Sequence, residues 1–177
     1  MLRPPVPGDA APLLEAFADP DVMRYIGLGE TGTLQDAIAQ VERMTRAWEL
    51  DGFGRFVVVR AEDGLVIGRV GLLAWDPLTW TSGVRREIGD RAETELGWTL
   101  IRSAWGRGYA AEAASAVRDW ALAVVRPARL ISLIHPENLR SKRVAEKLGE
   151  RFDREVFTRR GVPAELWALP STDRTSS

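Results

Sequence analysis

A glycine turn between a strand-like run and a helix-like run constrains the fold of this chain more than any other feature. The run Glu93–Leu100 precedes the turn Trp105–Ala110, which contains two glycines, and small residues follow from Ala111 to Ala116. Such a turn aims several backbone N–H groups at one point, and the helix start adds unpaired N–H groups and the positive end of its dipole. A phosphate is the usual ligand of such a site. The segment therefore predicts a phosphate-bearing cofactor.

The length and charge of the chain restrict its organisation and its partners. Its 177 residues suffice for one domain with a core, so we expect a single domain over residues 1–170 and a disordered tail over 171–177. Lysine and arginine number 24 against 25 acidic residues, a net charge of −1. This balance predicts neither nucleic acid nor an anionic membrane as a partner. No apolar stretch approaches the roughly 18 residues of a membrane span.

The chain contains no cysteine and a single histidine, His135. These counts exclude a disulfide framework, a thiolate metal site and a cysteine nucleophile, and they argue against a histidine-based metal site. We therefore expect no metal. A cysteine-free chain suits the reducing cytosol, and no secretory pattern follows Met1, so we expect a cytoplasmic protein.

The N-terminal half is expected to hold two helices and a hairpin. Asp9 is expected to cap a helix over Ala10–Ala18, and Thr33 to cap a longer helix over Leu34–Leu50. The β-branched runs Phe56–Val59 and Leu65–Leu73 predict two strands around a turn at Gly64, and the glycines of the second indicate a bulge or a close backbone approach. The turn-rich stretch Asp76–Asp90 is expected to be a loop, with at most a short extended piece.

The C-terminal half alternates strands and helices. Glu93–Leu100 and Leu130–Ile134 read as parallel strands, joined by a right-handed crossover through a helix over Ala110–Val125 whose buried stripe includes Val124. Asn138 is expected to cap a helix that ends at Gly149, and a final hairpin follows. This order predicts a mixed α/β sheet with helices on both faces, since a doubly wound fold would need more regular alternation.

Three motifs follow one another in the second half of the chain: the strand Glu95-Leu96-Gly97-Trp98, the turn Trp105-Gly106-Arg107-Gly108-Tyr109-Ala110 with Glu112-Ala113, and Asn138-x-x-Ser141 leading into Val144–Gly149. In this order and spacing they resemble the motifs of the GNAT superfamily of N-acetyltransferases. Within the superfamily they look like the branch of the ribosomal-protein alanine and serine N-acetyltransferases. The resemblance implies the GNAT-like acyl-CoA N-acyltransferase fold, with a mostly antiparallel central sheet and one splayed parallel strand pair.

The resemblance also implies acetyl-CoA as co-substrate and assigns its contacts. The pyrophosphate would bind the backbone N–H groups of Arg107, Gly108, Ala110 and Ala111. The pantetheine arm would lie in the gap beside the splayed strand, where Leu96, Trp98 and Thr99 hold the matching positions, and Asn138 would reach the pantetheine amide from the far side. The N–H of Trp98 would also hold the thioester oxygen as negative charge develops.

The acetyl transfer that the resemblance implies needs a base that accepts a proton from the amine and an acid that protonates the leaving thiolate. Glu95 is the first candidate for the base and Glu93 the second, because residues i and i+2 share one strand face. The usual acid of the family is a tyrosine, but this chain has Ala145 at that position. Ser141 is the best substitute, and a water molecule is the alternative. Each of these residues also has a purely structural reading, as a strand-end charge or a helix-turn serine.

The sequence leaves open the identity of the acceptor amine, and two other classes of function are alternatives to acetyl transfer. A peptide N-terminus and a small-molecule amine both suit the motifs, and Trp75 and Trp80 are candidates for the acceptor pocket wall or for the core. A non-catalytic acyl-CoA-binding module on the same fold is the main alternative. A Rossmann-like nucleotide site is disfavoured because Ala111 replaces the third glycine of the G-x-G-x-x-G pattern. The loop after Trp75 is also compatible with a contact in a homodimer.

Overall fold

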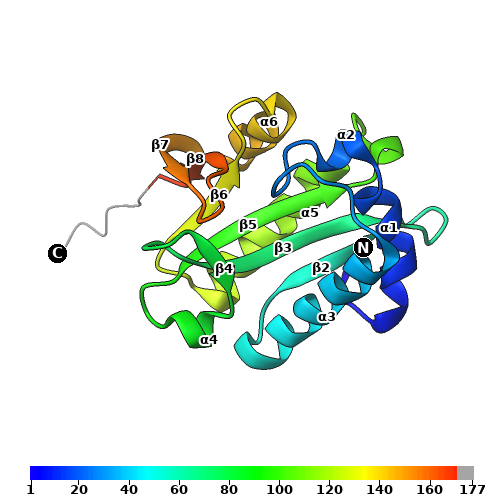
Figure 1. The fold of residues 1–177 in the computed structure, drawn as a ribbon, viewed down its shortest axis with the longest axis horizontal. Helices are drawn as coiled ribbons and strands as arrows, with labels where there is room; N and C mark the ends of the chain where they lie inside the picture. Colours follow the sequence, from blue (N-terminus) through cyan, green and yellow to red (C-terminus); the bar gives the residue numbers. More distant parts are fainter. Residues whose placement is uncertain (171–177) are drawn as a thin grey trace.

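An eight-stranded sheet forms the centre of the molecule (Figure 1). The structure, a computed structural model, describes residues 1–170, and the tail 171–177 that we expected to be disordered lies outside this range. The strands run in the order β1-β2-β3-β5-β6-β8-β7, and β4 pairs with β3. Their bounds are Leu2–Arg3 (β1), Arg55–Val59 (β2), Val66–Asp76 (β3), Thr81–Gly83 (β4), Glu93–Leu100 (β5), Leu130–Ile134 (β6), Arg151–Phe157 (β7) and Pro163–Ala168 (β8).

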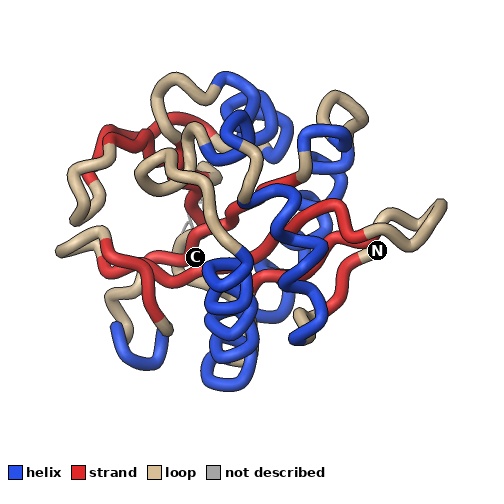
Figure 2. The backbone as a smooth tube through the Cα atoms, turned by 45° about the vertical axis from the view of Figure 1, so that its right-hand side comes forward, coloured by secondary structure: helices blue, strands red, loops and turns tan. Residues whose placement is uncertain are grey.

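Helices cover both faces of the sheet (Figures 1 and 2). Arg69 of β3 lies against the ring of Phe17 from the first helix. The next residue, Val70, points to the opposite face, where its register partner Phe56 contacts Trp120 at the end of the crossover helix. The helices are Ala10–Phe17 (α1), Pro20–Met23 (α2), Leu34–Asp51 (α3), Arg85–Ile88 (α4), Tyr109–Trp120 (α5) and Leu139–Leu148 (α6).

The two central strands of the parallel pair separate after one short contact. All neighbouring strands are antiparallel except β5 and β6, which are parallel and pair only at Thr94↔Leu130 and Glu95↔Ile131. On its other side β5 pairs with β3 along its whole length, from Trp75↔Glu93 to Gly68↔Leu100. The predicted mixed sheet and its parallel splayed pair are therefore confirmed, and the second half of β5 has one edge free of strand partners.

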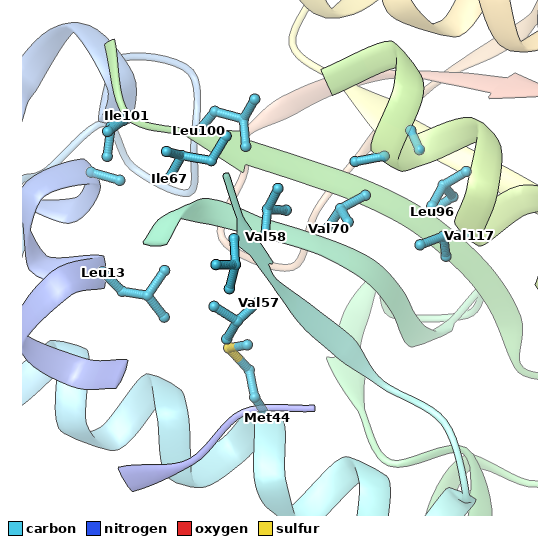
Figure 3. Packing of buried hydrophobic residues seen from close by; sticks show 14 of the residues in the cluster. Leu13, Met44, Val57, Val58, Ile67, Val70, Leu96, Leu100, Ile101 and Val117 are labelled. Carbon is cyan, nitrogen blue, oxygen red and sulfur yellow. The ribbon is translucent and has the colours of Figure 1, made fainter. Parts of the chain in front are cut away.

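Side chains from α1, α3, α5 and the strands between them form the main core (Figure 3). The exposed fraction is 0% for Leu13, for Val57 and for Leu96 of β5. Burial of each such side chain contributes about 1.5–3 kcal/mol to folding. Because Leu96 is anchored in this way, the strand that carries Glu95 and Trp98 is held rigidly beside the gap.

The glycines of β3 lie where its backbone closely approaches that of a neighbouring strand. A close approach was one of the two interpretations that the sequence allowed. Gly68 has φ +147°, and a Cβ added there would lie 2.2 Å from the carbonyl oxygen of Thr99. A side chain at this position would separate β3 from β5.

Three local expectations were wrong. Asp9 makes no capping hydrogen bond to α1; its buried carboxylate instead accepts hydrogen bonds from Arg3 Nη2 (2.6 Å) and Val6 N (2.7 Å). Val124 is 64% exposed, because α5 passes into a wider π-type turn over Ala121–Val125 that rotates this residue away from the sheet. The stretch expected to be a loop contains the helix α4, which is too short to show a period in the sequence, whereas β4 agrees with the short extended piece that the expectation allowed.

Candidate active site

The glycine turn presents open backbone at the start of α5. Gly106 and Gly108 have φ values of +74° and +84°, and a Cβ added to either would meet no atom within 4 Å. The first helical hydrogen bond runs from Glu112 N to Gly108 O at 3.0 Å. The N–H groups of the helix residues before Glu112, Ala110 and Ala111 among them, therefore have no helical acceptor. The turn is thus built to bind an anion through its backbone.

A groove of about 370 Å³ runs between the turn, the free edge of β5 and α6. Its walls include most of the residues assigned to the cofactor from the sequence, namely Trp98, Thr99, Gly108, Ala110, Ala111 and Asn138. Two assigned residues lie elsewhere: the exposed Arg107 does not line the groove, and Leu96 borders a neighbouring cavity. The groove therefore unites the turn and the splayed strand into one elongated site.

One face of α6 adds positive charge to this groove, which the sequence analysis missed. Arg140, Arg143 and Lys147 all line it. The Arg140 guanidinium lies 3.7 Å from the centre of the Trp105 ring, which holds it over the turn. Residues spaced by three and four share a helix face, so this signal was present in the sequence. These side chains suit a polyanionic ligand.

At the free edge of β5, the backbone N–H and C=O groups of Leu96 and Trp98 point into the gap between β5 and β6. The Leu96 carbonyl accepts a hydrogen bond from Ser132 Oγ of β6 at 2.8 Å, so the backbone of Leu96 faces β6. Backbone direction alternates along a strand, so the N–H and C=O groups of Trp98 face the same side and those of Thr99 face β3. Trp98 can therefore donate to a ligand in the gap, whereas Thr99 borders it chiefly through its side chain.

Beyond the splay, a second cavity of about 400 Å³ opens on the face of the sheet that carries Glu95. The indole Nε1 of Trp75 donates a hydrogen bond to Glu95 Oε2 at 2.6 Å. Burial raises the pKa of Glu95, while Arg55, the Trp75 hydrogen bond and Arg69 oppose the rise. A carboxylate made more basic in this way is suited to accept a proton.

The other base candidate, Glu93, is placed differently. It lines neither cavity, and its nearest cationic atom is Nη1 of Arg129 at 3.9 Å. The structure therefore brings Glu95, and not Glu93, to the cavity.

Residues shared by both cavities form the junction between them. They include Trp98 and Thr99 of β5, Asn138 and Ser141 of α6, and Tyr25 from the segment after α2. Asn138 caps α6 by accepting a hydrogen bond from Ser141 N at 3.1 Å, which leaves its amide nitrogen for other partners. Both sequence-assigned residues of α6 are therefore at the junction.

Tyr25 reaches the junction through its contact with His135. The two rings stack with centroids 5.0 Å apart, and both residues line the cavity that holds Glu95. The sequence analysis did not select Tyr25, because nothing in the irregular stretch around it indicates that it folds across β5.

The hairpins β3–β4 and β7–β8 close the outer side of the Glu95 cavity. Figure 2 shows them on the same side of the molecule, and Arg159 N donates a hydrogen bond to Trp80 O at 3.4 Å where their loops meet. Trp75 and Trp80 both line the cavity, as one of their two sequence interpretations expected, and Trp80 also packs against the buried cluster around Ile131, as the other expected. No helix among residues 1–170 is long and apolar enough to cross a membrane.

A splayed parallel strand pair beside a glycine turn at a helix start is the arrangement that the resemblance to the GNAT N-acetyltransferases implied. A family model described as an acetyltransferase (GNAT) domain matches residues 1–151, so the chain belongs to this family. The chain is 29% identical over 155 residues to YnaD of Bacillus subtilis, named as an uncharacterized N-acetyltransferase, covering 86% of this chain and 79% of YnaD. The predictions of the GNAT family and of an N-acetyltransferase are therefore confirmed.

Solved structures share the fold over nearly the whole chain. An acetyltransferase from Agrobacterium tumefaciens superposes with a TM-score of 0.74 at 29% identity, over 96% of this chain and 90% of that one. AAC(6')-Ib in complex with ribostamycin and coenzyme A gives a TM-score of 0.75 at 22% identity, over 100% and 97% of the two chains. At that identity the second likeness concerns the fold alone.

Proposed function

We propose that this chain transfers the acetyl group of acetyl-CoA to a primary amine, either a small molecule or a protein N-terminus, within a ternary complex. The observation that carries the proposal is the meeting of two cavities at the end of the β5–β6 splay, one beside the phosphate-binding turn and one beside Glu95. We treat residues 1–170 as one catalytic unit because the walls of the two cavities come from segments between Asp21 and Ala164. The cytoplasmic location stays a prediction from the sequence.

The groove beside α5 is proposed to hold acetyl-CoA. The free N–H groups of Gly108, Ala110 and Ala111 would bind the pyrophosphate, and the basic face of α6 would balance the remaining phosphate charge. The pantetheine arm would follow the free edge of β5 opposite Asn138. AAC(6')-Ib, which has the same fold, forms a complex with coenzyme A, and this supports coenzyme A as a ligand of the fold.

The reaction then proceeds by direct attack at the junction. The neutral amine attacks the thioester carbonyl carbon, and the Trp98 N–H stabilises the oxyanion that forms. As the C–S bond breaks, Glu95 takes the proton that the amine loses, directly or through water, and the thiolate receives a proton from Ser141 or from water. The products are an N-acetylated amine and free coenzyme A. The chain has the fully buried Ala145 at the position where the family usually has a tyrosine, so no side chain at this position can act as the acid.

Two measurements on the purified chain test the proposal. Titration calorimetry should show acetyl-CoA binding that Gly108→Val weakens at least tenfold, because the new side chain would fill the space of the phosphate. Gly64→Val is the matched control, since Gly64 has φ +74° with open space around it in a hairpin turn that lines neither cavity. Equal losses in both variants would contradict the assignment of the turn.

Thiol release from acetyl-CoA across a panel of amines and peptides separates an enzyme from a binding module. We expect release that depends on one class of amine. Tight acetyl-CoA binding without release under any amine would favour the non-catalytic alternative.

A further inference from the structure

Arg69 is a buried cation whose hydrogen-bonding groups are unused. It is only 7% exposed, it lies in the middle of β3, and it lines the cavity that holds Glu95. Its Nε and Nη1 atoms are buried and have no hydrogen-bond partner among the described residues. A buried guanidinium without partners costs several kcal/mol, so an arrangement of this kind calls for an anion that completes it.

The contact with Phe17 leaves the edge of this guanidinium available. The Arg69 Cζ atom lies 4.9 Å from the centre of the Phe17 ring, which makes a cation–π contact. A guanidinium has five N–H donors, and an aromatic ring supplies none of the oxygen acceptors that they require. The contact with Phe17 therefore does not satisfy the buried Nε and Nη1 groups of Arg69.

A second arginine stands beside the first on the same face of the sheet. Arg55 of β2 pairs in register with Gly71, two residues beyond Arg69 on β3, so the two side chains are diagonal neighbours. Arg55 also lines the cavity. Burial, followed by the charge of Arg55, lowers the pKa of Arg69 well below its usual value.

Two glycines occupy the strand positions between Arg55 and the strand that carries Glu95. Gly71 pairs with Gly97 of β5 in the same register row as Arg55, and Gly97 lines the cavity. A Cβ added at Gly97 would lie 3.5 Å from Glu95 Oε1. The register row from Arg55 through Gly71 to Gly97 therefore adds no other side chain between Arg55 and Glu95, whose carboxylate lies over Gly97.

The charge of the cavity wall is unbalanced. Its charged side chains are Arg55, Arg69, Arg159 and Arg160 against one carboxylate, Glu95. The carboxylate is already bonded to Trp75 and forms no hydrogen bond to either buried arginine. A polycationic acceptor would place its extra charges against arginine, whereas an anionic group would neutralise the excess.

We propose that the acceptor amine carries a carboxylate, and that Arg69 and Arg55 bind this carboxylate while the amine faces Glu95 and the thioester. This assignment of the substrate class rests on the proposed acetyl transfer. The acceptor is thus a small amino-acid-like molecule, acetylated on nitrogen, whose carboxylate keeps its charge throughout the reaction. The planar fork of Arg69 suits two parallel hydrogen bonds to a carboxylate, which orient the amine at the opposite end.

Matched pairs of acceptors test this proposal without any mutation. Amino acids of different length are compared with their own amides in a thiol-release assay at saturating acetyl-CoA. The amide keeps the size and removes the charge, and its amine is less basic, which by itself favours its reaction. We expect at least one amino acid with kcat/KM roughly 10- to 100-fold above that of its amide. Equal values for every pair, or higher values for the amides, would overturn the assignment.

Variants of Arg69 locate the effect. Arg69→Gln should raise KM for the carboxylate acceptor by about 10-fold or more, so that its preference over its own amide is lost, while KM for acetyl-CoA, which binds in the groove that Arg69 does not line, stays within twofold. Arg69→Lys should restore part of the loss, because it keeps the charge without the fork. Thermal unfolding of both variants monitors the lost contact with Phe17, and Arg55→Gln tests the same subsite at a position that does not touch Phe17.

Binding of products separates the failure of this proposal from the failure of the proposed function. N-acetyl amino acids and N-acetyl amino amides are titrated into the protein with free coenzyme A present, so that no turnover is needed. Preference for the acids, lost in Arg69→Gln, supports the carboxylate subsite even if no turnover is found. Turnover of uncharged amines, with no preference for carboxylates in binding or rate, would overturn the subsite and leave the acetyl transfer intact.

Discussion

At the scale of single residues, burial gives Glu95 its chemical character. Its position in the strand was readable from the sequence, since the alternation of β5 and the resemblance to GNAT strands both selected it. Its environment was not readable, because Trp75, Arg55 and Arg69 come from other strands. The same burial that raises the pKa of Glu95 makes it a stronger base toward an amine.

Glu95→Gln keeps the shape of the side chain and removes its basicity. We expect kcat to fall by roughly 10²- to 10⁴-fold, the usual contribution of a general base, while acetyl-CoA affinity changes by less than twofold. Stopped assays of thiol release and calorimetry measure the two quantities. Glu93→Gln is the control, because Glu93 lies outside both cavities and should retain full activity. Unchanged turnover in Glu95→Gln would remove it as the base.

At the scale of elements, the capping residues of this molecule have two roles: one cap only stabilises its helix, and another also lines the binding site. Thr33 and Asp36 form a capping box at the start of α3, in which Asp36 N donates to Thr33 Oγ1 at 3.3 Å and Thr33 N to Asp36 Oδ2 at 2.8 Å. Asn138 caps α6 and also lines both cavities. The sequence predicted both caps because side-chain capping depends on near neighbours alone.

Comparison of these two caps isolates the binding role of Asn138. Thr33→Ala and Asn138→Ala should each lower the free energy of unfolding by about 1 kcal/mol, as the loss of a cap does. Only Asn138→Ala should also raise KM for acetyl-CoA, by about fivefold or more, since it removes a donor to the pantetheine. Denaturant unfolding and steady-state kinetics give both numbers. A KM unchanged in Asn138→Ala would leave this residue as a cap only.

The splay of β5 and β6 is stabilised by buried polar groups that replace strand pairing. Ser132 Oγ lies 2.8 Å from Leu96 O and 3.1 Å from Glu150 Oε1. The single hydroxyl proton is used toward the Leu96 carbonyl, which only accepts, so the second bond runs from a protonated Glu150 to Ser132. Glu150 is 2% exposed, and burial raises its pKa to about 8. A neutral Glu150 therefore supports the gap that the pantetheine is proposed to enter.

The stability of the chain should depend on pH through Glu150. The folded-state pKa of about 8 exceeds the ordinary value of 4.5, so its contribution is complete below pH 4.5 and is lost as the pH rises through about 8. The slope in this window is up to about 1.4 kcal/mol per pH unit. Glu150→Gln stays neutral and should flatten the stability profile between about pH 5 and 8, as measured by denaturant unfolding. A variant with the wild-type slope would show that Glu150 is ionised in the folded state.

At the scale of the whole molecule, the site is assembled from segments far apart in sequence. The turn, β5 and the start of α6 were predictable, because each is a local pattern with a local consequence. Arg69 and Tyr25 were not, because register and loop packing decide which strand faces the cavity and which loop crosses it. The short helix α4 was not predicted for another reason: it is stabilised by the contact of its first residue with Asp51, and not by its own sequence.

Two cavities that meet at one junction predict a definite kinetic behaviour. Initial rates of thiol release are measured while acetyl-CoA and a carboxylate-bearing amine are varied together. Direct transfer in a ternary complex predicts release that requires both substrates and double-reciprocal lines that intersect. Parallel lines would indicate an acetylated enzyme intermediate, and absence of release with every amine would remove the transferase; either result would contradict the account.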